Sequence, residues 1–522
     1  MSKSLMIQGT GSGVGKSLIV AGLCRIFRDM GINVAPFKAQ NMALNSFVTE
    51  EGGEIGRAQA LQAEAARIKP SVDMNPILLK ASGETGCQVI INGKVHSNMK
   101  ATEYYLFKKE AWIAVTQAYE RLSKKYDLIV IEGAGSPAEI NLMADEIVNM
   151  KVARYADAPV ILVGDIDKGG VFASLYGTIE LLKDSSNNSN CSSSSNSLCD
   201  ADYIKAFIIN KFRGDISILN PGLTMIHGKT GRPVIGVIPY LGDLSLHEED
   251  GIPLERLKGS RVQGFKDSKI KIVVLRLRYI SNFTDFDPFM YEPDVELIYS
   301  LWDGDIENAD LLIIPGSKNT VKDLLSLRVN GIEESIKRAV EKGILLIGIC
   351  GGYQMLGGKI YDPYGIESEY KEIDGLGLLD IETVIEKVKV TSRVEAELVQ
   401  RSELGVKSAT PNSLKGYEIH MGVSRGDIGL FKISRLTPHA SRLTDVMDGS
   451  AKGNVWGTYI HGIFDNDRFR RSLINSLRAK KGLNPTEVIV DYSKLRDNGI
   501  NRWAKILKGN IDLAFIERLV GI

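Results

Sequence analysis

A cysteine set between glycines is the first feature of the sequence that can do chemistry. In ILLIGICGGYQML (344–356) an apolar run ends at Cys350, two glycines follow, and an amphipathic stretch begins. This pattern is typical of a strand, a sharp turn and a helix that expose a nucleophile at the helix start. The helix dipole there favours the thiolate, and the amide of Gly351 is a candidate oxyanion donor. We therefore predict that Cys350 is a nucleophile.

A thiolate nucleophile also needs a base. His461 is the best placed of the six histidines, because it closes the apolar run VWGTYIHG (455–462). His420 is the second candidate, although a structural or substrate-positioning role suits it better. The segment PGSKNT (315–320) also ends an apolar run. Its amides, with that of Gly316 among them, are predicted to complete the oxyanion hole.

A glycine-rich segment near the N-terminus predicts a second site. GTGSGVGKS (9–17) follows an apolar strand and opens a helix, so its backbone amides and the helix N-terminus face an anion. In such a loop the lysine reaches the terminal phosphates of ATP and the serine hydroxyl ligates Mg²⁺. Thr10 stands where the strict spacing has glycine. The predicted ATP-binding residues of this loop are Thr10, Gly13, Val14, Gly15, Lys16 and Ser17.

Polar residues at the ends of other predicted strands add to this second site. Glu132, within DLIVIEGAG (127–135), is predicted to be a further Mg²⁺ ligand, and Lys38 to neutralise a transferring phosphoryl group. Asn210 is a candidate contact for adenine. Predicted substrate contacts follow the same strand ends, and they are Gln40, Asn41, Asn45, Asp165, Asp167 and Lys168.

Both sites depend on elements that present loops at one edge of a sheet. Short runs rich in Val and Ile end in Gly, Asp or Asn and alternate with amphipathic stretches such as 16–30 and 103–124. This pattern is typical of buried parallel strands between helices, whose ligands bind at the carboxyl ends of the strands. We predict an α/β chain with two doubly wound, mostly parallel-sheet domains.

Two polar stretches interrupt this pattern, one between the domains and one within the first. Residues 251–268 are predicted to be a linker between a domain over 1–250 and a second domain over 269–522. The low-complexity stretch 184–200 is too polar to offset its ordering entropy, so we predict a flexible surface insertion.

Composition excludes several classes of protein. Among 522 residues, 64 are basic and 64 acidic, and this balance argues against nucleic acid or an anionic membrane as a partner. No apolar run is long enough to span a bilayer, and the N-terminus has no signal-peptide core. Five cysteines without a CxxC pair disfavour a disulfide framework and a structural zinc site. We expect a cytoplasmic enzyme, and its oligomeric state is left open.

The motifs resemble two known families. GTGSGVGKS, with Lys38 after the second strand and the later EGAG, resembles the dethiobiotin synthetase branch of P-loop proteins, which phosphorylate a carboxyl or carbamate. The G-x-C-x-G motif and the later histidine resemble class I glutamine amidotransferases, which release ammonia from glutamine. That family has a glutamate two residues after the histidine, where this chain has Ile463. The resemblance therefore implies a Cys–His dyad, or a third member from elsewhere, such as Glu418.

Together the two halves imply ATP-dependent amidation of an acid. From residue 1 to roughly residue 510 the chain resembles the cobyric acid synthase family, in stretches such as PFKAQNMALNS, VGDIDKGGVFAS, INKFRGD and GTYIHGIFDN. This resemblance implies ATP, Mg²⁺ and glutamine, and a corrinoid as the small-molecule substrate. It also implies amidation of the b, d, e and g carboxylates of adenosylcobyrinic acid a,c-diamide.

Other interpretations stay open at this point. A cobyrinic acid a,c-diamide synthase would amidate other carboxylates of the same ring, and AQNMALNS and INKFRGD argue against it. A murein-type amidotransferase is more distant. From another class, a non-catalytic P-loop regulator with a degenerate amidotransferase domain would explain Ile463, but the intact Cys350 turn and the complete GKS oppose it.

Overall fold

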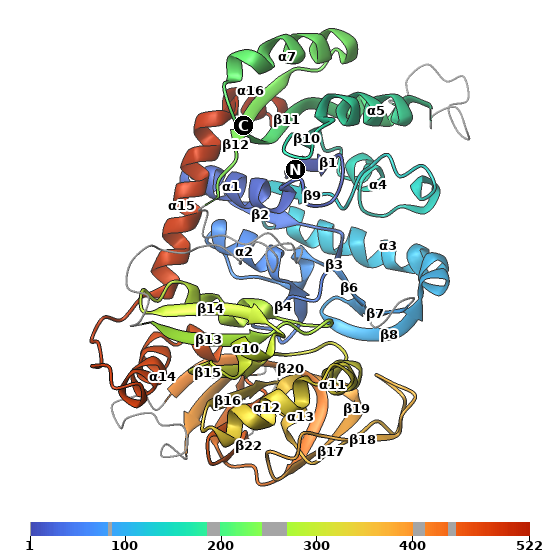
Figure 1. Cartoon of the computed structure of the whole chain (residues 1–522). Coiled ribbons are helices and arrows are strands. Elements are labelled where there is room, and N and C mark those ends of the chain that lie inside the picture. Colours follow the sequence, from blue (N-terminus) through green and yellow to red (C-terminus); the bar gives the residue numbers. More distant parts are fainter. Residues whose placement is uncertain (1, 82–85, 185–198, 243–268, 400–412, 437–444) are drawn as a thin grey trace.

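The structure is a computed structural model with two α/β units, which Figure 1 shows one above the other. It describes residues 2–81, 86–184, 199–242, 269–399, 413–436 and 445–522. The predicted linker lies outside the described residues, and so does the predicted insertion apart from residues 184, 199 and 200. No helix within the described ranges is long and apolar enough to cross a membrane.

The N-terminal unit is built on a sheet of six parallel strands. In spatial order the strands are β12 (Val234–Pro239), β11 (Ile204–Phe212), β10 (Val160–Asp165), β1 (Lys3–Gly9), β9 (Leu128–Glu132) and β2 (Val34–Phe37). Successive side chains of a strand enter different cores: Leu5 and Ile7 pack on one face and Met6 on the other. Helices cover both faces, which confirms the predicted doubly wound arrangement.

The helices of this unit divide between the two faces. On the face of Leu5 and Ile7 lie α1 (Lys16–Asp29) and the end of α2 (Arg57–Ala65). The opposite face carries α3 (Ala101–Ser123), α4 (Met150–Tyr155), α5 (Val171–Asp184), α6 (Asp200–Tyr203) and α7 (Ile216–Thr230). Both amphipathic stretches singled out in the sequence, 16–30 and 103–124, are helices.

The second unit has a sheet with one reversed edge strand. Its order is β14 (Val295–Ser300), β13 (Ile270–Leu275), β15 (Leu311–Ile314), β16 (Leu345–Ile349), β24 (Val455–Thr458) and the antiparallel β23 (Ser450–Lys452). Its helices are α9 (Asp287–Met290), α10 (Asp303–Ile306), α11 (Thr320–Val329), α12 (Ile332–Glu341), α13 (Gly351–Leu356) and α14 (Asp467–Lys480). Five of the six strands are parallel, so the predicted fold class is confirmed for this unit as well.

Smaller sheets lie between and beside these two. The second unit carries β17 (Lys359–Tyr361), β18 (Glu372–Asp374), β19 (Ile381–Leu398), β20 (Ser413–Gly426), β21 (Phe431–Leu436) and β22 (Asp445–Asp448). The N-terminal unit adds β3 (Gln40–Met42), β4 (Ser46–Val48), β5 (Glu54–Gly56), β6 (Ile77–Ala81), β7 (Gly86–Ile91) and β8 (Lys94–Lys100). Val48 of β4 packs on Tyr417 and Ile419 of β20, so these strands join the units.

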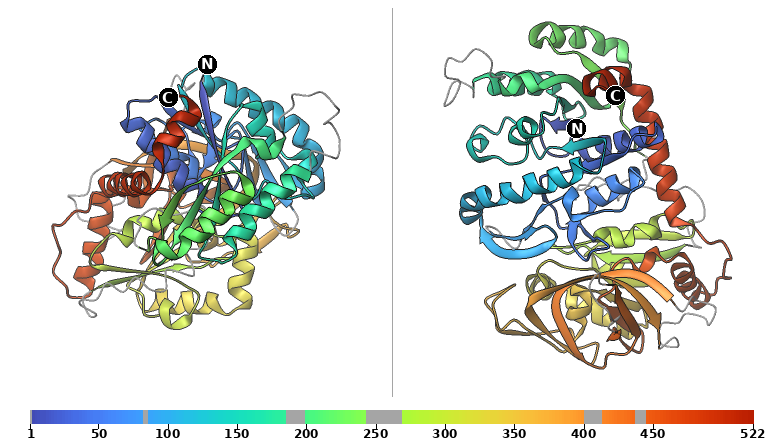
Figure 2. Two further views of the ribbon diagram at one scale, coloured as in Figure 1. Left: turned by 90° about the horizontal axis from the view of Figure 1, so that it is seen from above. Right: turned by 180° about the vertical axis from the view of Figure 1, so that it is seen from behind.

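The C-terminal helices return to the N-terminal unit. Figures 1 and 2 show α15 (Tyr492–Asn510) running along the side of the first sheet, with α16 (Leu513–Val520) beyond it. Trp503 and Leu507 pack against α1 at Gly22, where a Cβ atom would lie 2.6 Å from Leu507 Cδ2. The domain division predicted from the sequence assigned residues 492–522 to the second unit, whereas their apolar face completes the core of the first.

Loss of this packing should destabilise the first unit. Trp503 is 3% exposed and its indole N–H donates to the Leu18 carbonyl. We expect Trp503→Ala to lower the free energy of unfolding of the N-terminal unit by about 3 to 5 kcal/mol. Urea unfolding followed by far-UV circular dichroism measures the change. Trp302, 69% exposed, is the matched control, and Trp302→Ala should change stability by less than about 0.5 kcal/mol.

Candidate active sites

Cys350 sits on a strained turn between β16 and α13. Its backbone has φ 53° and ψ −108°, a conformation that side-chain-bearing residues rarely adopt and that the surrounding structure must hold. The flanking glycines make the turn possible: a Cβ on Gly352 would lie 2.0 Å from the Ile314 carbonyl oxygen, and one on Gly348 2.6 Å from Leu356 Cδ1. The thiol donates to the Ile419 carbonyl at 3.7 Å. The strand, sharp turn and helix around Cys350 are therefore as the sequence predicts, although Cys350 is only 6% exposed.

His461 is held by an aspartate from a distant part of the chain. Its Nδ1 lies 2.6 Å from Oδ2 of Asp285, which belongs to the short 3₁₀ turn Phe283–Phe286 after β13. The other oxygen of Asp285 accepts from the Gly462 amide (3.2 Å) and from the Tyr417 hydroxyl (3.4 Å). The Tyr417 ring also stacks on the imidazole, with centroids 5.3 Å apart. These contacts fix both the position and the orientation of the ring.

The charges around His461 favour its protonated form. Burial disfavours an imidazolium, but the negative charges of the Asp285 carboxylate and of a Cys350 thiolate outweigh this and raise the pKa of His461 to about 10. Nε2 makes no hydrogen bond among the described residues, whereas Nδ1 is bonded to the carboxylate. The Asp285 carboxylate therefore orients the imidazole, and the negative charge of a Cys350 thiolate further stabilises its protonated form.

The third member of this site was missed in the sequence. The sequence predicts a Cys–His dyad or Glu418 as the third member, but Glu418 is bonded to Arg435 (2.6 Å) and lies 3.3 Å from His420. Asp285 occupies the position on His461 instead. The sequence signal for it is the acidic stretch SNFTDFDPF (281–289), which is separated by five residues from the strand at 270–275 and so lies at the same sheet edge as Cys350.

His420 does not take the place of His461. Its Nδ1 lies 2.7 Å from the Gly422 carbonyl oxygen, its Nε2 faces Glu418, and its ring stacks on Tyr459 at 3.8 Å. Both ring nitrogens are therefore engaged, in agreement with a structural or positioning role.

The two oxyanion candidates lie beside the cysteine and the histidine. A Cβ on Gly351 would lie 2.8 Å from the Ser317 amide nitrogen, and one on Gly316 would lie 3.2 Å from His461 Cε1. The segments 315–317 and 350–352 therefore adjoin, and the structure brings all four predicted residues of this half together.

The phosphate loop links β1 to α1 as the sequence predicts. Gly13 (φ 69°) and Gly15 (φ 98°) adopt left-handed conformations, and Gly15 precedes the first turn of α1. Lys16 reaches back over the loop, where its Nζ donates to the carbonyls of Gly11 (2.8 Å) and Gly135 (3.2 Å). Gly135 belongs to the EGAG segment after β9. The ammonium group is thus held where the loop and this strand end meet.

Glu132 is the centre of a buried polar cluster. Its Oε1 accepts from the Ser17 hydroxyl (2.8 Å) and from Lys38 (2.9 Å), and its Oε2 accepts from Gln62 (2.6 Å). Burial by itself would raise the pKa of Glu132, but Lys38, Gln62 and Lys16 together lower it. The carboxylate therefore stays charged beside the phosphate loop.

These oxygens fit a magnesium ion bound together with phosphates. Mg²⁺ is commonly held by one or two protein oxygens, the substrate's phosphates and water. Ser17 and Glu132 supply two oxygens at the end of the loop. A dedicated cluster of three or more His, Cys, Asp or Glu ligands does not occur in the part of the chain that is described.

Asn210 and Lys211 brace the phosphate loop from β11. The Asn210 amide donates to the Val14 carbonyl (2.8 Å) and Lys211 Nζ to that of Gly13 (2.5 Å). Lys211 also pairs with Asp165 at 3.2 Å. Asn210, the candidate adenine contact, thus has its amide on the loop, and its Oδ1 accepts from the Lys211 amide. Lys211 had not been singled out in the sequence.

The other predicted substrate residues differ in exposure. Asp167 and Lys168 are exposed after β10, and Asp167 pairs with Arg213 (3.0 Å). Gln40 accepts from the Tyr104 hydroxyl, and Asn41 donates to Gln59 (3.1 Å). The Asn45 side chain is buried against the second unit, where its oxygen accepts from the Phe283 amide.

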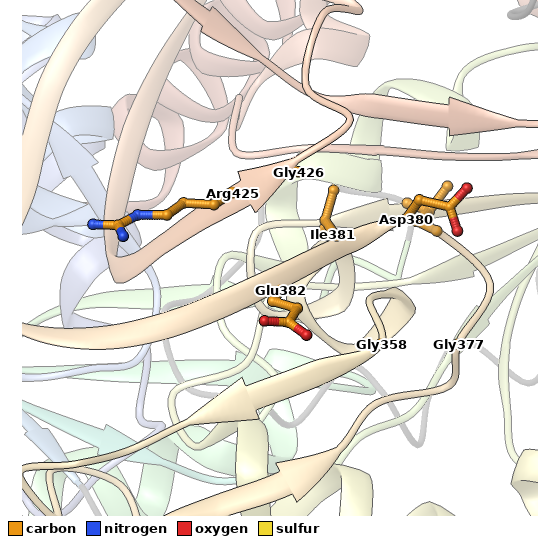
Figure 3. A pocket seen from close by; sticks show the side chains of 8 residues that line it. Gly358, Gly377, Asp380, Ile381, Glu382, Arg425 and Gly426 are labelled. Carbon is orange, nitrogen blue, oxygen red and sulfur yellow. The ribbon is translucent and has the colours of Figure 1, made fainter.

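A pocket in the second unit lies apart from both sites. Figure 3 shows its lining, in which the Arg425 and Asp380 side chains point in opposite directions. Asp380 bonds instead to Lys452 at 2.8 Å. Gly358, Gly377, Leu379, Ile381, Glu382 and Gly426 form the rest of the lining. The polar groups do not converge, so this pocket is not a candidate site.

Comparisons with known proteins agree with this geometry. Residues 5–254 match the CobQ/CobB/MinD/ParA nucleotide binding domain, and residues 271–469 match the CobB/CobQ-like glutamine amidotransferase domain. The chain is 49% identical over 522 residues, the full length of both chains, to the cobyric acid synthase of Thermodesulfovibrio yellowstonii. It is 47% identical to that of Caldanaerobacter subterraneus subsp. tengcongensis, over 100% of this chain and 99% of the relative. The chain belongs to the cobyric acid synthase family.

Proposed function

We propose that this chain uses ATP and the amide nitrogen of glutamine to amidate the b, d, e and g carboxylates of adenosylcobyrinic acid a,c-diamide, which gives adenosylcobyric acid. The observation that carries the proposal is the combination of a thiol–imidazole–carboxylate site and a phosphate loop in one chain that aligns end to end with cobyric acid synthases. An amide synthase needs both an ammonia source and a way to activate the acid.

In the glutaminase half, the Cys350 thiolate attacks the glutamine amide carbon. His461 gives a proton to the departing ammonia, and the amides near Gly351 and Gly316 stabilise the oxyanion. Water then hydrolyses the thioester to glutamate, with His461 as general base. The contact of 2.6 Å between Asp285 and His461 supports these roles, because it keeps the ring in one orientation and stabilises its charged form.

In the synthetase half, the phosphate loop and Lys16 bind ATP and orient its terminal phosphoryl group toward a corrinoid carboxylate. Ser17 and Glu132 would hold Mg²⁺, which when bound neutralises charge on the phosphates. Lys38 adds a positive charge beside the transferring group. The carboxylate becomes an acyl phosphate with release of ADP, and ammonia then displaces phosphate to form the amide. We retain Asp167 and Lys168 as candidate corrinoid contacts because both are exposed and follow β10, the strand that pairs with β1.

The rival functions are less well supported. The hypothesis of a non-catalytic regulator depends on Ile463, which stands where the amidotransferase family has a glutamate. Asp285 supplies a carboxylate to His461 instead, so this support is lost. The a,c-diamide synthase shares the chemistry and differs in substrate, so product analysis separates it. A cytoplasmic location stays a prediction from the sequence.

Removal of the thiol should separate the two half-reactions. With Mg·ATP and adenosylcobyrinic acid a,c-diamide, we expect mass spectrometry to record four successive carboxylate-to-amide exchanges. Cys350→Ala should abolish the exchanges driven by glutamine and retain those driven by added ammonia, because only the thioester step is lost. Exchanges on cobyrinic acid alone would move the assignment to the a,c-diamide synthase, and no exchange on either corrinoid would refute this class of substrate.

Replacement of Asp285 tests the third member of the glutaminase site. Asp285→Asn should lower kcat for glutamine hydrolysis by about 10² to 10⁴, the usual value of general acid–base catalysis. It should also lower the pKa of His461, because the neighbouring negative charge is removed. Steady-state assays and an NMR titration of the imidazole measure the two effects. The matched variant Glu418→Gln should keep the His461 pKa; an equal change in both variants would contradict the assignment of Asp285.

Replacement of Glu132 tests the synthetase half. Glu132→Gln keeps the size of the side chain but removes the charge shared by Ser17 and Lys38. Amidation with ammonia as the nitrogen source should fall on the order of a hundredfold, by analogy with the loss of one electrostatic contact in an enzyme site. Glutamine hydrolysis by the same variant is the internal control. Unchanged amidation would remove Glu132 from the proposed site.

A further inference from the structure

The turn that carries Asp285 is held by the N-terminal unit. Asn282, with φ 52°, begins this turn and is 1% exposed. Its Oδ1 accepts from the backbone amide of Ser46 at 3.1 Å. One residue later, the Phe283 amide donates to the Asn45 side-chain oxygen at 3.0 Å. Two adjacent residues of the first unit thus bond to two adjacent residues of the turn.

The same turn touches His461 on its other side. Asn282 Nδ2 donates to the Tyr417 hydroxyl (3.3 Å) and lies 3.5 Å from His461 Nδ1. Asp285 follows three residues after Asn282 and bonds to that same nitrogen. A displacement of the turn would therefore move the carboxylate relative to the imidazole.

Buried charges fix Ser46 in place. Lys80 Nζ donates to the Ser46 hydroxyl (2.9 Å) and pairs with Glu54 at 2.6 Å. Glu54 also pairs at 2.6 Å with Lys389 of β19, in the second unit. All three side chains are at most 8% exposed, and a buried charge that loses its partner is strongly unfavourable. Figure 1 shows β4, which begins at Ser46, at the junction of the two units.

We propose that Asn45 and Ser46 are positioning residues for glutamine hydrolysis, because they hold the turn 282–285 so that Asp285 stays on His461. The inference rests on the proposed glutaminase function of this site. As a consequence, the amidotransferase unit has a complete site only while residues 38–46 of the synthetase unit are in place. This segment begins at Lys38, which bonds to Glu132 beside the phosphate loop.

Three variants of the full chain isolate the effect. Asn45→Ala removes the acceptor for the Phe283 amide, whereas Asn45→Asp retains a side-chain oxygen there. Thr391→Val is the matched control, because it removes another bond across the same interface, from Thr391 Oγ1 to the Gly52 carbonyl (2.9 Å), that does not touch the turn. ATP binding measured by calorimetry shows that the N-terminal unit of each variant is folded.

Two readouts distinguish positioning from general destabilisation. The first is steady-state glutamine hydrolysis: Asn45→Ala should lower kcat about tenfold to a hundredfold with KM nearly unchanged, as expected when a reacting group is misplaced. The second is the titration of His461, followed on ¹³C-labelled histidine and assigned by the loss of its resonance in His461→Asn. Asn45→Ala should titrate at a lower pH than the unchanged chain, because the carboxylate is held less firmly. Asn45→Asp should recover both quantities in large part, and Thr391→Val should match the unchanged chain.

The outcomes separate this inference from the proposed function. An Asn45→Ala chain with unchanged kcat and His461 titration would overturn the inference alone. Equal losses in Thr391→Val, or no recovery in Asn45→Asp, would also overturn it, because the effect would then belong to the interface as a whole. Absence of cysteine-dependent hydrolysis in the unchanged chain would refute the proposed function, and the His461 titration would still test the hold on Asp285. If Asn45→Ala fails to fold, Asn45→Ser takes its place in both measurements.

Discussion

The buried contact between Asp285 and His461 is the interaction on which the glutaminase half depends. A buried imidazole would ordinarily lose its proton, so a stable charge at His461 requires a carboxylate at hydrogen-bond distance. The aspartate comes from the turn after β13, the cysteine from the turn after β16 and the histidine from the segment that follows β24. These three ends adjoin because the strands are parallel and ordered β13, β15, β16, β24. The sheet topology is therefore a condition of the chemistry.

The phosphate site follows the same rule with other residues. Ser17, Lys38 and Glu132 come from the starts or ends of elements at one edge of the first sheet, and one oxygen of the Glu132 carboxylate accepts hydrogen bonds from the other two. Its other oxygen is bonded by Gln62 of α2, a helix that begins at Arg57, eleven residues after Ser46. One short stretch of the N-terminal unit thus supplies contacts to both sites. Through this stretch the synthetase unit can hold the glutaminase site of the second unit in its active geometry.

Local patterns were sufficient to predict part of this arrangement. The strands that carry Cys350, His461 and the phosphate loop are apolar runs with an abrupt polar end, and glycine spacing identified both turns. The strands β17 to β22 were not predicted. β19 alternates buried and more exposed residues toward both of its ends, but these strands lack the continuous apolar runs that identify the buried parallel strands. Helix α15 was assigned to the wrong neighbour, because an amphipathic pattern specifies that a helix has an apolar face and leaves open which core buries it.

Asp285 shows why site residues are harder to predict than the elements that carry them. Its neighbour Asp287 has the same charge and lies two residues away in the same stretch. The difference between them is spatial: Asn282 in its left-handed conformation directs the turn, and the bonds from Asn45 and Ser46 hold it so that Asp285 meets the ring. Those bonds join residues more than 230 positions apart. A motif defined within one unit cannot contain them, so the acid that orients the histidine is specified by the way the two units pack.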